Sequence, residues 1–272
     1  MKYKTIFSIA LVAALVVACA TNPFTGKRTL ALVPNNQIFP MAFQQYDQFL
    51  NENKVVRGTA DARMITNVGQ KIATASERYL NANGYTGYLN EYQWEYNLVE
   101  DPAANAWCMP GGKIVFYTGI LPITQGEAGV AAVMGHEVAH ALANHGQQRM
   151  SAGQLNQLAA VGVSVASASS ENAAIYNQAY GLASNVGVML PFSRSHESEA
   201  DKIGLTLMAI AGYDPIEAAD LWRRMQANAG GNAPPEFLST HPSSNTRINN
   251  ITSWAAGAKA EARKFGVTSF KK

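Results

Sequence analysis

The sequence has little cysteine, no run of basic residues and no apolar run long enough to span a bilayer comfortably. Its two cysteines, Cys19 and Cys108, are too few for a disulfide framework. The chain has 21 lysine and arginine residues against 19 aspartate and glutamate residues. Without Lys2 and Lys4, which lie in a leader discussed below, the numbers are 19 and 19. A neutral chain without basic clusters gives no indication of nucleic-acid binding.

The first residues have the features of a secretory signal. Lys2 and Lys4 precede an apolar run at 6–17, which is short for a transmembrane helix. The run ends in Val-Val-Ala-Cys19, which resembles a bacterial lipobox, although an ordinary secreted protein with a chance cysteine is the alternative. We therefore predict a lipoprotein signal peptide at 1–18, a lipid-anchored tether at 19–36 that begins at acylated Cys19, and one domain at 37–272.

The central motif is His136-Glu137-Val138-Ala139-His140, which reads H-E-x-x-H. Apolar residues recur with helical spacing around it and no proline interrupts residues 127–147, so this stretch is predicted to form one buried helix. Residues four apart share a helix face, so His136 and His140 can bind one tetrahedral metal ion. Glu137 is then placed to act on the water at that metal. The pattern predicts a zinc hydrolase with Glu137 as general base.

The region before this helix predicts two helices and a small sheet. Helical patterns cover 38–53 and 61–80, with Asp61 as a possible N-cap. Period-two alternation at 94–99 and two short strands at 104–109 and 113–118 follow. An exposed edge strand there could hold a peptide substrate in extended form, although a sheet that only packs the domain is equally compatible with the pattern.

A zinc site with two histidines needs a third protein ligand and an open position. Glycine and histidine are missing from the offsets after His140 that the metzincin arrangement requires, and His145 lies about 140° round the predicted helix, in a surface or ligand-supporting position. Glu197 and Asp201 share one face of a later helix. One carboxylate can bind the metal while the other orients a ligating histidine. Glu199 is predicted to be solvated or paired with a cation.

Residues 151–190 are rich in small residues. A helical hairpin that covers the core is the preferred interpretation, and a mobile lid over the cleft is the alternative. The segment is too short and too polar to cross a membrane as one helix.

The assembled pattern resembles the membrane-associated gluzincin family of the CAAX prenyl proteases, HtpX and the Oma-type proteases. The matching pieces are Asn105 to Gly112, the H-E-x-x-H motif, an E-x-x-x-D motif at Glu197–Asp201, and a H-P-x-x-x-x-R run from His241 to Arg247. The resemblance implies a mainly helical (α+β) metallopeptidase domain with a small sheet beside the zinc helix. It also implies one Zn²⁺ bound by His136, His140 and Glu197, with Asp201 in support and His241 and Arg247 near the metal.

The pattern is most similar to the LoiP- and BepA-like lipoprotein endopeptidases of the bacterial envelope. The chain differs from BepA-like members because no room remains for tetratricopeptide repeats after a last helix at about 245–265. It differs from the prenyl proteases and HtpX because no spanning segment follows the leader. The resemblance therefore predicts a zinc endopeptidase that is lipid-anchored in the bacterial envelope, in the periplasm and on the outer membrane, and that acts on misfolded or membrane-associated proteins.

His241 has two predicted roles. A neutral imidazole that reaches the zinc would fill its open position and inhibit the resting enzyme, whereas a positioned donor would stabilise the negative charge on the scissile carbonyl oxygen. A chaperone or assembly module with little turnover, self-inhibited by His241, is therefore the alternative function. A purely structural lipoprotein would leave the predicted metal ligands unexplained.

Overall fold

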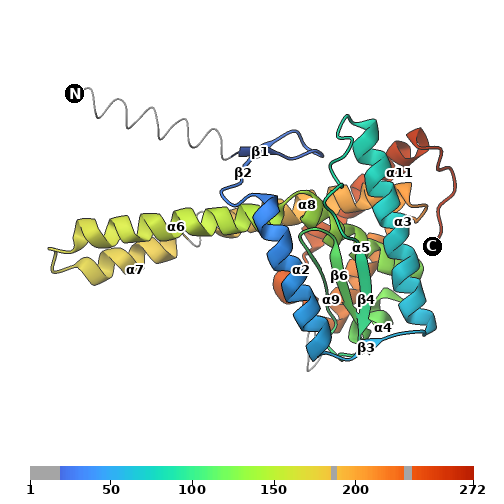
Figure 1. The fold of residues 1–272 in the computed structure, drawn as a ribbon, viewed down its shortest axis with the longest axis horizontal. Helices are drawn as coiled ribbons and strands as arrows, with labels where there is room; N and C mark the ends of the chain where they lie inside the picture. Colours follow the sequence, from blue (N-terminus) through green and yellow to red (C-terminus); the bar gives the residue numbers. More distant parts are fainter. Residues whose placement is uncertain (1–18, 185–188, 230–234) are drawn as a thin grey trace.

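The computed structural model describes residues 19–184, 189–229 and 235–272. The fold is mainly helical with a small mixed sheet, as predicted (Figure 1). The predicted leader at 1–18 lies outside the described residues, so lipidation at Cys19 stays a prediction. In the part of the chain that is described, no helix combines the length and the apolar character needed to cross a membrane.

The chain enters the fold through a short hairpin, in which β1 (Cys19–Thr21) pairs antiparallel with β2 (Arg28–Leu30). The segment predicted to be a tether is attached to the body along part of its length. Phe24 stacks on Tyr79 with ring centroids 5.1 Å apart. The backbone N–H of Leu32 donates to the Ser151 hydroxyl at 3.1 Å. The hairpin thus packs on helices from the middle of the chain.

Two long helices and the sheet form one side of the core. The helices are α2 (Asn35–Glu52) and α3 (Ala60–Ala82), and the N-cap of α3 is Thr59, whose hydroxyl accepts from the backbone N–H of Ala62, rather than the predicted Asp61. The strands are β3 (Val55–Val56), β4 (Glu95–Val99), β5 (Ala106–Met109) and β6 (Lys113–Tyr117).

The described strands of this sheet run in the order β3-β4-β6-β5, with β4 and β6 parallel and the other neighbours antiparallel. Strand β5 therefore lies at one edge. Tyr46 of α2 is fully buried and donates its hydroxyl to the Ile114 carbonyl of β6 at 3.0 Å, which fixes this helix on one face of the sheet. Side chains from both faces of the sheet are buried, since Ile114 and Phe116 belong to the main core whereas Val115 packs with Tyr46 in a second cluster.

The helix α5 (Glu127–Leu142) lies at the centre of the molecule, after the short turns η1 (Thr118–Ile120) and α4 (Leu121–Thr124). All of its residues from Ala128 to Leu142 are buried. It crosses α8 (Leu190–Ile210) closely, because Gly135 faces Gly204 and neither carries a side chain. The helices α9 (Ile216–Ala229), α10 (Phe237–Thr240) and α11 (Asn245–Lys264) complete the core around this pair.

The predicted single helix over 127–147 is wrong at its C-terminal end. It stops at Leu142, and Asn144 adopts a left-handed conformation with φ of 56° before α6 (His145–Ser167) begins. Asn144 tolerates this region better than most residues, because its short polar side chain can bond locally. Its Nδ2 donates to the Tyr88 hydroxyl at 2.9 Å, and that hydroxyl donates to the Leu142 carbonyl at 2.8 Å. These bonds hold the bend.

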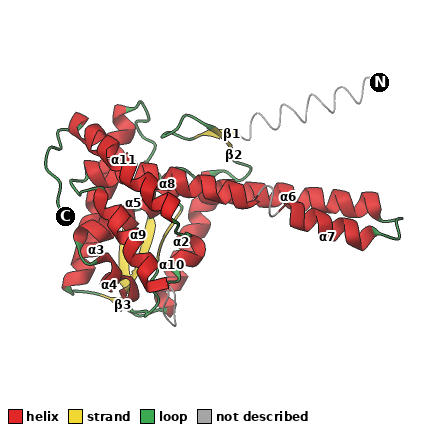
Figure 2. Ribbon diagram, turned by 180° about the vertical axis from the view of Figure 1, so that it is seen from behind, coloured by secondary structure: helices red, strands yellow, loops and turns green. Residues whose placement is uncertain are grey.

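The predicted hairpin is present, with α6 packed against α7 (Ala173–Ser184). It does not cover the core. It extends away from the body, as Figures 1 and 2 both show. Its polar side chains bond between the two helices, since Ser164 donates to Asn177 and Tyr180 donates to Asn156, each at 2.8 Å. Large apolar side chains such as Leu158 and Val165 are exposed instead.

Candidate metal centre

Four ligand side chains from three parts of the chain converge at one point. His136 and His140 project from adjacent turns of α5, and their Nε2 atoms lie 3.1 Å apart. Glu197 of α8 places Oε2 at 3.4 Å from His136 Nε2 and Oε1 at 3.3 Å from His140 Nε2. His241, just after α10, brings Nδ1 to 3.2 Å from His136 Nε2. One ligand atom from each of the four lies within 4.8 Å of the others.

The donor set fits a zinc ion. A tetrahedral ion with bonds of about 2.0–2.1 Å holds its ligand atoms about 3.3 Å apart. His136 Nε2 and His140 Nε2 lie 3.1 Å apart, and each lies 3.3–3.4 Å from one of the two carboxylate oxygens of Glu197. Buried imidazole nitrogens that face one another and a carboxylate are well satisfied by a shared cation, because each is costly to bury without a partner. His136, His140 and Glu197 are all buried, so the group suits a metal more than it suits water.

Asp201 contacts the ring nitrogen of His136 that faces away from the ligand cluster. Its Oδ1 lies 3.0 Å from His136 Nδ1, so His136 can donate there while Nε2 stays free for the metal. Arg247 donates Nε to Oδ2 and Nη2 to Oδ1 of the same carboxylate, both at 2.7 Å. Burial opposes ionisation of Asp201, but the charge of Arg247 and the bonds to His136 and Arg247 together outweigh it and lower the pKa of this carboxyl. Arg247 also lies over Trp222, with its guanidinium carbon 3.7 Å from the ring centroid.

The two ligand histidines have different electrostatic surroundings. Burial lowers the pKa of His136, but hydrogen bonds to Asp201 and Glu197 outweigh it and raise that pKa to about 9. Burial dominates at His140 and lowers its pKa to about 3, since Glu197 is the carboxylate that opposes the shift there. At neutral pH the metal-free site therefore favours protonation of His136 and a neutral His140.

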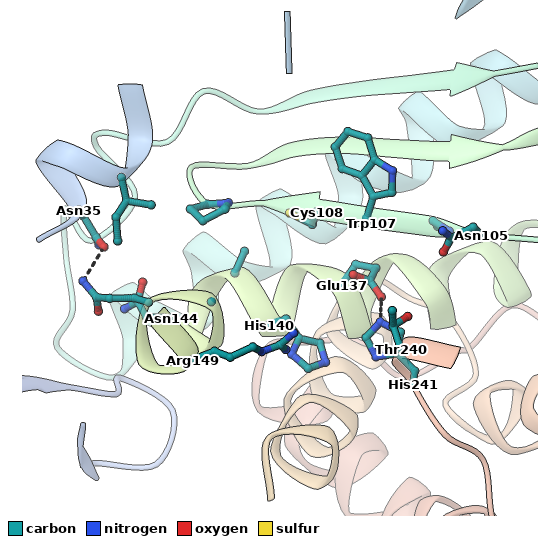
Figure 3. A pocket seen from close by; sticks show the side chains of 16 residues that line it. Asn35, Asn105, Trp107, Cys108, Glu137, His140, Asn144, Arg149, Thr240 and His241 are labelled. Carbon is teal, nitrogen blue, oxygen red and sulfur yellow. Dashed lines mark hydrogen bonds and ion pairs between the residues drawn. The ribbon is translucent and has the colours of Figure 1, made fainter. Parts of the chain in front are cut away.

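Glu137 lies between this cluster and the edge strand β5 (Figure 3). The backbone of Cys108 hydrogen-bonds to its carboxylate. His241 Nε2 lies 3.3 Å from Oε1, but without hydrogen-bond alignment, and Oε1 has no hydrogen bond within the described residues. Burial raises the pKa of Glu137 above its ordinary value. A buried carboxylate with an open oxygen beside a metal position can accept a proton there.

A cleft of about 360 Å³ opens onto this group. Strand β5 forms one wall through Ala106, Trp107 and Cys108, and α5 forms the floor with Glu137 and His140 (Figure 3). His241 and Thr240 lie opposite the strand. The cleft thus places an extended backbone edge alongside the candidate base and the ligand cluster.

The structure gives the surroundings of two residues near the site whose positions the sequence left less certain. Glu199, predicted to be solvated or paired with a cation, accepts hydrogen bonds from Asn22 and from Thr25 in the loop of the β1–β2 hairpin. His145, which the sequence left open between a surface and a supporting position, is fully buried, with Nδ1 2.9 Å from His140 Nδ1. The sequence signal for this position was the Asn144-His145-Gly146 triplet, because Asn and Gly commonly end a helix.

Comparisons with known proteins identify relatives. The pattern of peptidase family M48 matches residues 66–255. The mitochondrial metalloendopeptidase OMA1 of Schizosaccharomyces pombe is 41% identical over 64% of this chain and 50% of its own length. The Saccharomyces cerevisiae OMA1 is 37% identical over 70% of this chain and 54% of its own length. The Escherichia coli K12 beta-barrel assembly-enhancing protease is 26% identical over 63% of this chain and 37% of its own length.

These comparisons correct one prediction. The bacterial, outer-membrane location predicted from the leader and from the LoiP- and BepA-like pattern is contradicted, because the relatives of higher identity are mitochondrial OMA1 proteins. The lipoprotein features themselves are untested. The chain spans about half the length of these two curated relatives.

The predicted enzyme class and cofactor are confirmed at the level of the family. A His-His-Glu group stands on the helices where the sequence motifs placed it, and the relatives are named metalloendopeptidases. The family match covers well over half of the chain and includes both helices that carry these residues. The chain therefore belongs to peptidase family M48, with zinc as its cofactor.

Proposed function

We propose that this protein is a zinc-dependent endopeptidase that hydrolyses misfolded or membrane-associated proteins, with Glu137 as the general base. The observation that carries the proposal is the open carboxylate oxygen of Glu137, which lies between the ligand cluster and the free edge of β5. When bound, zinc supplies the Lewis acid that polarises the scissile carbonyl and acidifies the attacking water.

Strand β5 provides the binding edge for the substrate backbone. Asn105 accepts from the N–H of Tyr117 in β6, and hydrogen-bonded pairs alternate along an antiparallel ladder. Ala106 and Cys108 therefore direct their carbonyl groups to the outer edge, where they line the cleft. A peptide that adds to this edge in extended form brings one of its carbonyls over His136 and His140.

N-methylation of the peptide amides beside the scissile bond is expected to weaken binding, because it removes the N–H groups that would bond to the β5 carbonyls.

Glu137 transfers the proton in the reaction. Its carboxylate accepts a proton from the water that attacks the scissile carbonyl carbon. It then delivers that proton to the amide nitrogen as the C–N bond breaks, so the products are a carboxylate and an amine. The buried surroundings and the raised pKa make the protonated form of Glu137 accessible between the two steps.

His241 is proposed to occupy the fourth ligand position in the resting state. Its Nδ1 lies 2.9 Å from Glu197 Oε2 and 3.2 Å from His136 Nε2, which is a ligand-to-ligand separation. This geometry supports the inhibitory role more than the charge-stabilising role.

His241→Ala is then expected to raise basal proteolysis of an unfolded substrate, measured at saturating zinc. A fall in activity would instead identify His241 as a stabiliser of the carbonyl charge.

A protease-fold binding or assembly module with little turnover is the second candidate. The position of His241 among the ligands favours it, because a permanently occupied fourth position leaves no room for the reacting water.

The experiment that separates these functions is digestion of casein by the wild type and by Glu137→Gln, with zinc content measured in both. The protease proposal predicts about one zinc in each and a loss of cleavage in the variant alone. If neither the zinc-loaded wild type nor the zinc-loaded His241→Ala variant cleaves casein, the binding module would be favoured.

A further inference from the structure

The two ligand histidines of α5 are supported by different partners. His136 directs Nδ1 to the Asp201 carboxylate at 3.0 Å. His140 directs Nδ1 to another histidine, His145, with the two Nδ1 atoms 2.9 Å apart. His145 is fully buried, so water does not compete for this contact.

The arrangement of protons follows from the ligand role of His140. Its Nε2 faces the cluster, 3.3 Å from Glu197 Oε1, and must be unprotonated to bind a metal. The ring proton is then on Nδ1, which donates to Nδ1 of His145. His145 accepts there as the tautomer with its own proton on Nε2, the nitrogen that lies 4.0 Å from Glu199 Oε2.

The surroundings of His145 fix its ring. The His196 ring of α8 stacks on it at 4.0 Å with an interplanar angle of 8°. Gln148 Oε1 lies 3.1 Å from His196 Nε2, and Gln148 Nε2 donates to the Ala143 carbonyl at 2.8 Å. The left-handed Asn144 turns the chain so that the first residue of α6 points back beneath α5. A straight helix would point position 145 elsewhere.

We propose that His145 is a positioning residue for the metal: it fixes the tautomer and the ring orientation of His140 by accepting its Nδ1–H. The imidazole of His145 thus accepts the Nδ1–H of His140, as the Asp201 carboxylate accepts the Nδ1–H of His136. The inference rests on the zinc site of the proposed function. Its test is a metal-binding measurement, so it can fail while proteolysis stands.

The test compares His145→Phe with His145→Asn. Phenylalanine keeps a ring that can stack on His196 but offers no acceptor. Asparagine places Oδ1 where Nδ1 was, so it restores the acceptor without the ring. Zinc affinity is measured by competition with a chromophoric chelator, and the geometry of the site is followed by the absorption spectrum of the Co²⁺-substituted protein. The thermal midpoint of each zinc-free variant reports its fold.

Loss of a group that orients a ligand typically costs about 10–100-fold in metal affinity. We expect that loss and an altered Co²⁺ spectrum in His145→Phe, with most of the affinity restored in His145→Asn. Wild-type affinity in His145→Phe would overturn the proposal. An equal loss of affinity in both variants would also overturn it, because shape and not the acceptor would then matter.

Discussion

The Asp201 carboxylate accepts hydrogen bonds from Arg247 Nε and Nη2 and lies 3.0 Å from His136 Nδ1, so one side chain connects a ligand histidine to a buried cation. Asn at this position keeps the shape but turns an NH₂ group toward one of these donors. We expect Asp201→Asn to weaken zinc binding by about 10–100-fold. Breaking a buried pair should also lower the free energy of unfolding of the zinc-free protein by about 3–5 kcal/mol.

Chelator competition and urea unfolding measure these two effects. Lys54→Ala is the matched control, because it breaks the exposed Lys54–Glu100 pair and should cost less than about 1 kcal/mol. An Asp201→Asn protein as stable as the control variant would show that Arg247 gains nothing from this carboxylate.

The sequence predicts the residues of the metal centre well where their positions depend on local spacing. His136 and His140 are brought together by one helical turn, and Glu197 and Asp201 share a face for the same reason. The position of His145 could not be derived in this way, because it depends on the bend at Asn144. That bend is stabilised by Tyr88, a residue that the chain brings in from 56 positions away.

At the scale of the elements, the crossing of α5 and α8 sets the distance between the histidines and Glu197. A Cβ atom on Gly204 would lie 2.9 Å from the backbone nitrogen of His136 and from the carbonyl carbon of Gly135. Both contacts are with backbone, so the helices must separate to admit it. Gly204→Ala is expected to cost about 1–3 kcal/mol of unfolding free energy and to weaken zinc binding.

Gly257→Ala is the control for that substitution. Gly257 lies inside α11 with open space where its Cβ would stand, so alanine should stabilise the protein by about 0.4–1 kcal/mol. Urea unfolding and zinc titration of both variants provide the comparison. Equal zinc affinity in Gly204→Ala and the wild type would mean that the crossing does not set the ligand geometry.

The bend between α5 and α6 gives a second prediction at this scale. Asn144→Gly and Asn144→Ala both remove the hydrogen bond to Tyr88, but glycine adopts a φ of 56° without strain. Asn144→Ala should therefore be less stable than Asn144→Gly by about 1 kcal/mol in urea unfolding. The reverse order would indicate that the chain straightens in the alanine variant.

The element boundaries show where the sequence pattern was insufficient. Helical and strand periodicity predicted the sheet before α5, and the structure confirms each strand within about two residues. Periodicity could not place the hairpin of α6 and α7, because its apolar residues point outward and its polar residues bond inward.

At the scale of the whole molecule, the metal connects elements that are far apart in the chain. A ligand that binds only the folded state stabilises it by about 2.7 kcal/mol when its concentration is 100 times its Kd. For a protein of this size, each kcal/mol shifts the melting temperature by about 2–4 °C. Removal of zinc should then lower Tm by about 5–10 °C, as measured by calorimetry before and after dialysis against a chelator.

The His136→Ala, His140→Ala double variant is the control for this effect. Without the two imidazoles its Tm should not respond to the chelator. A wild-type protein that melts at the same temperature with and without the chelator would show that the ligands are held together by the fold alone.

The hairpin of α6 and α7 lies between His140 and Glu197 in the chain, yet α5 and α8 pack directly against each other. The hairpin that connects the two ligand helices is therefore not needed to hold them together, and its backbone could be cleaved. We expect a chain with a specific cleavage site inserted between Ser170 and Glu171 to survive scission as two fragments, 1–170 and 171–272, that co-elute and still digest casein. Only denaturant should part them, and fragments that separate in native buffer would show that covalent continuity is required. If the fragments stay together, the two halves of this enzyme could be expressed separately and reconstituted into an active complex.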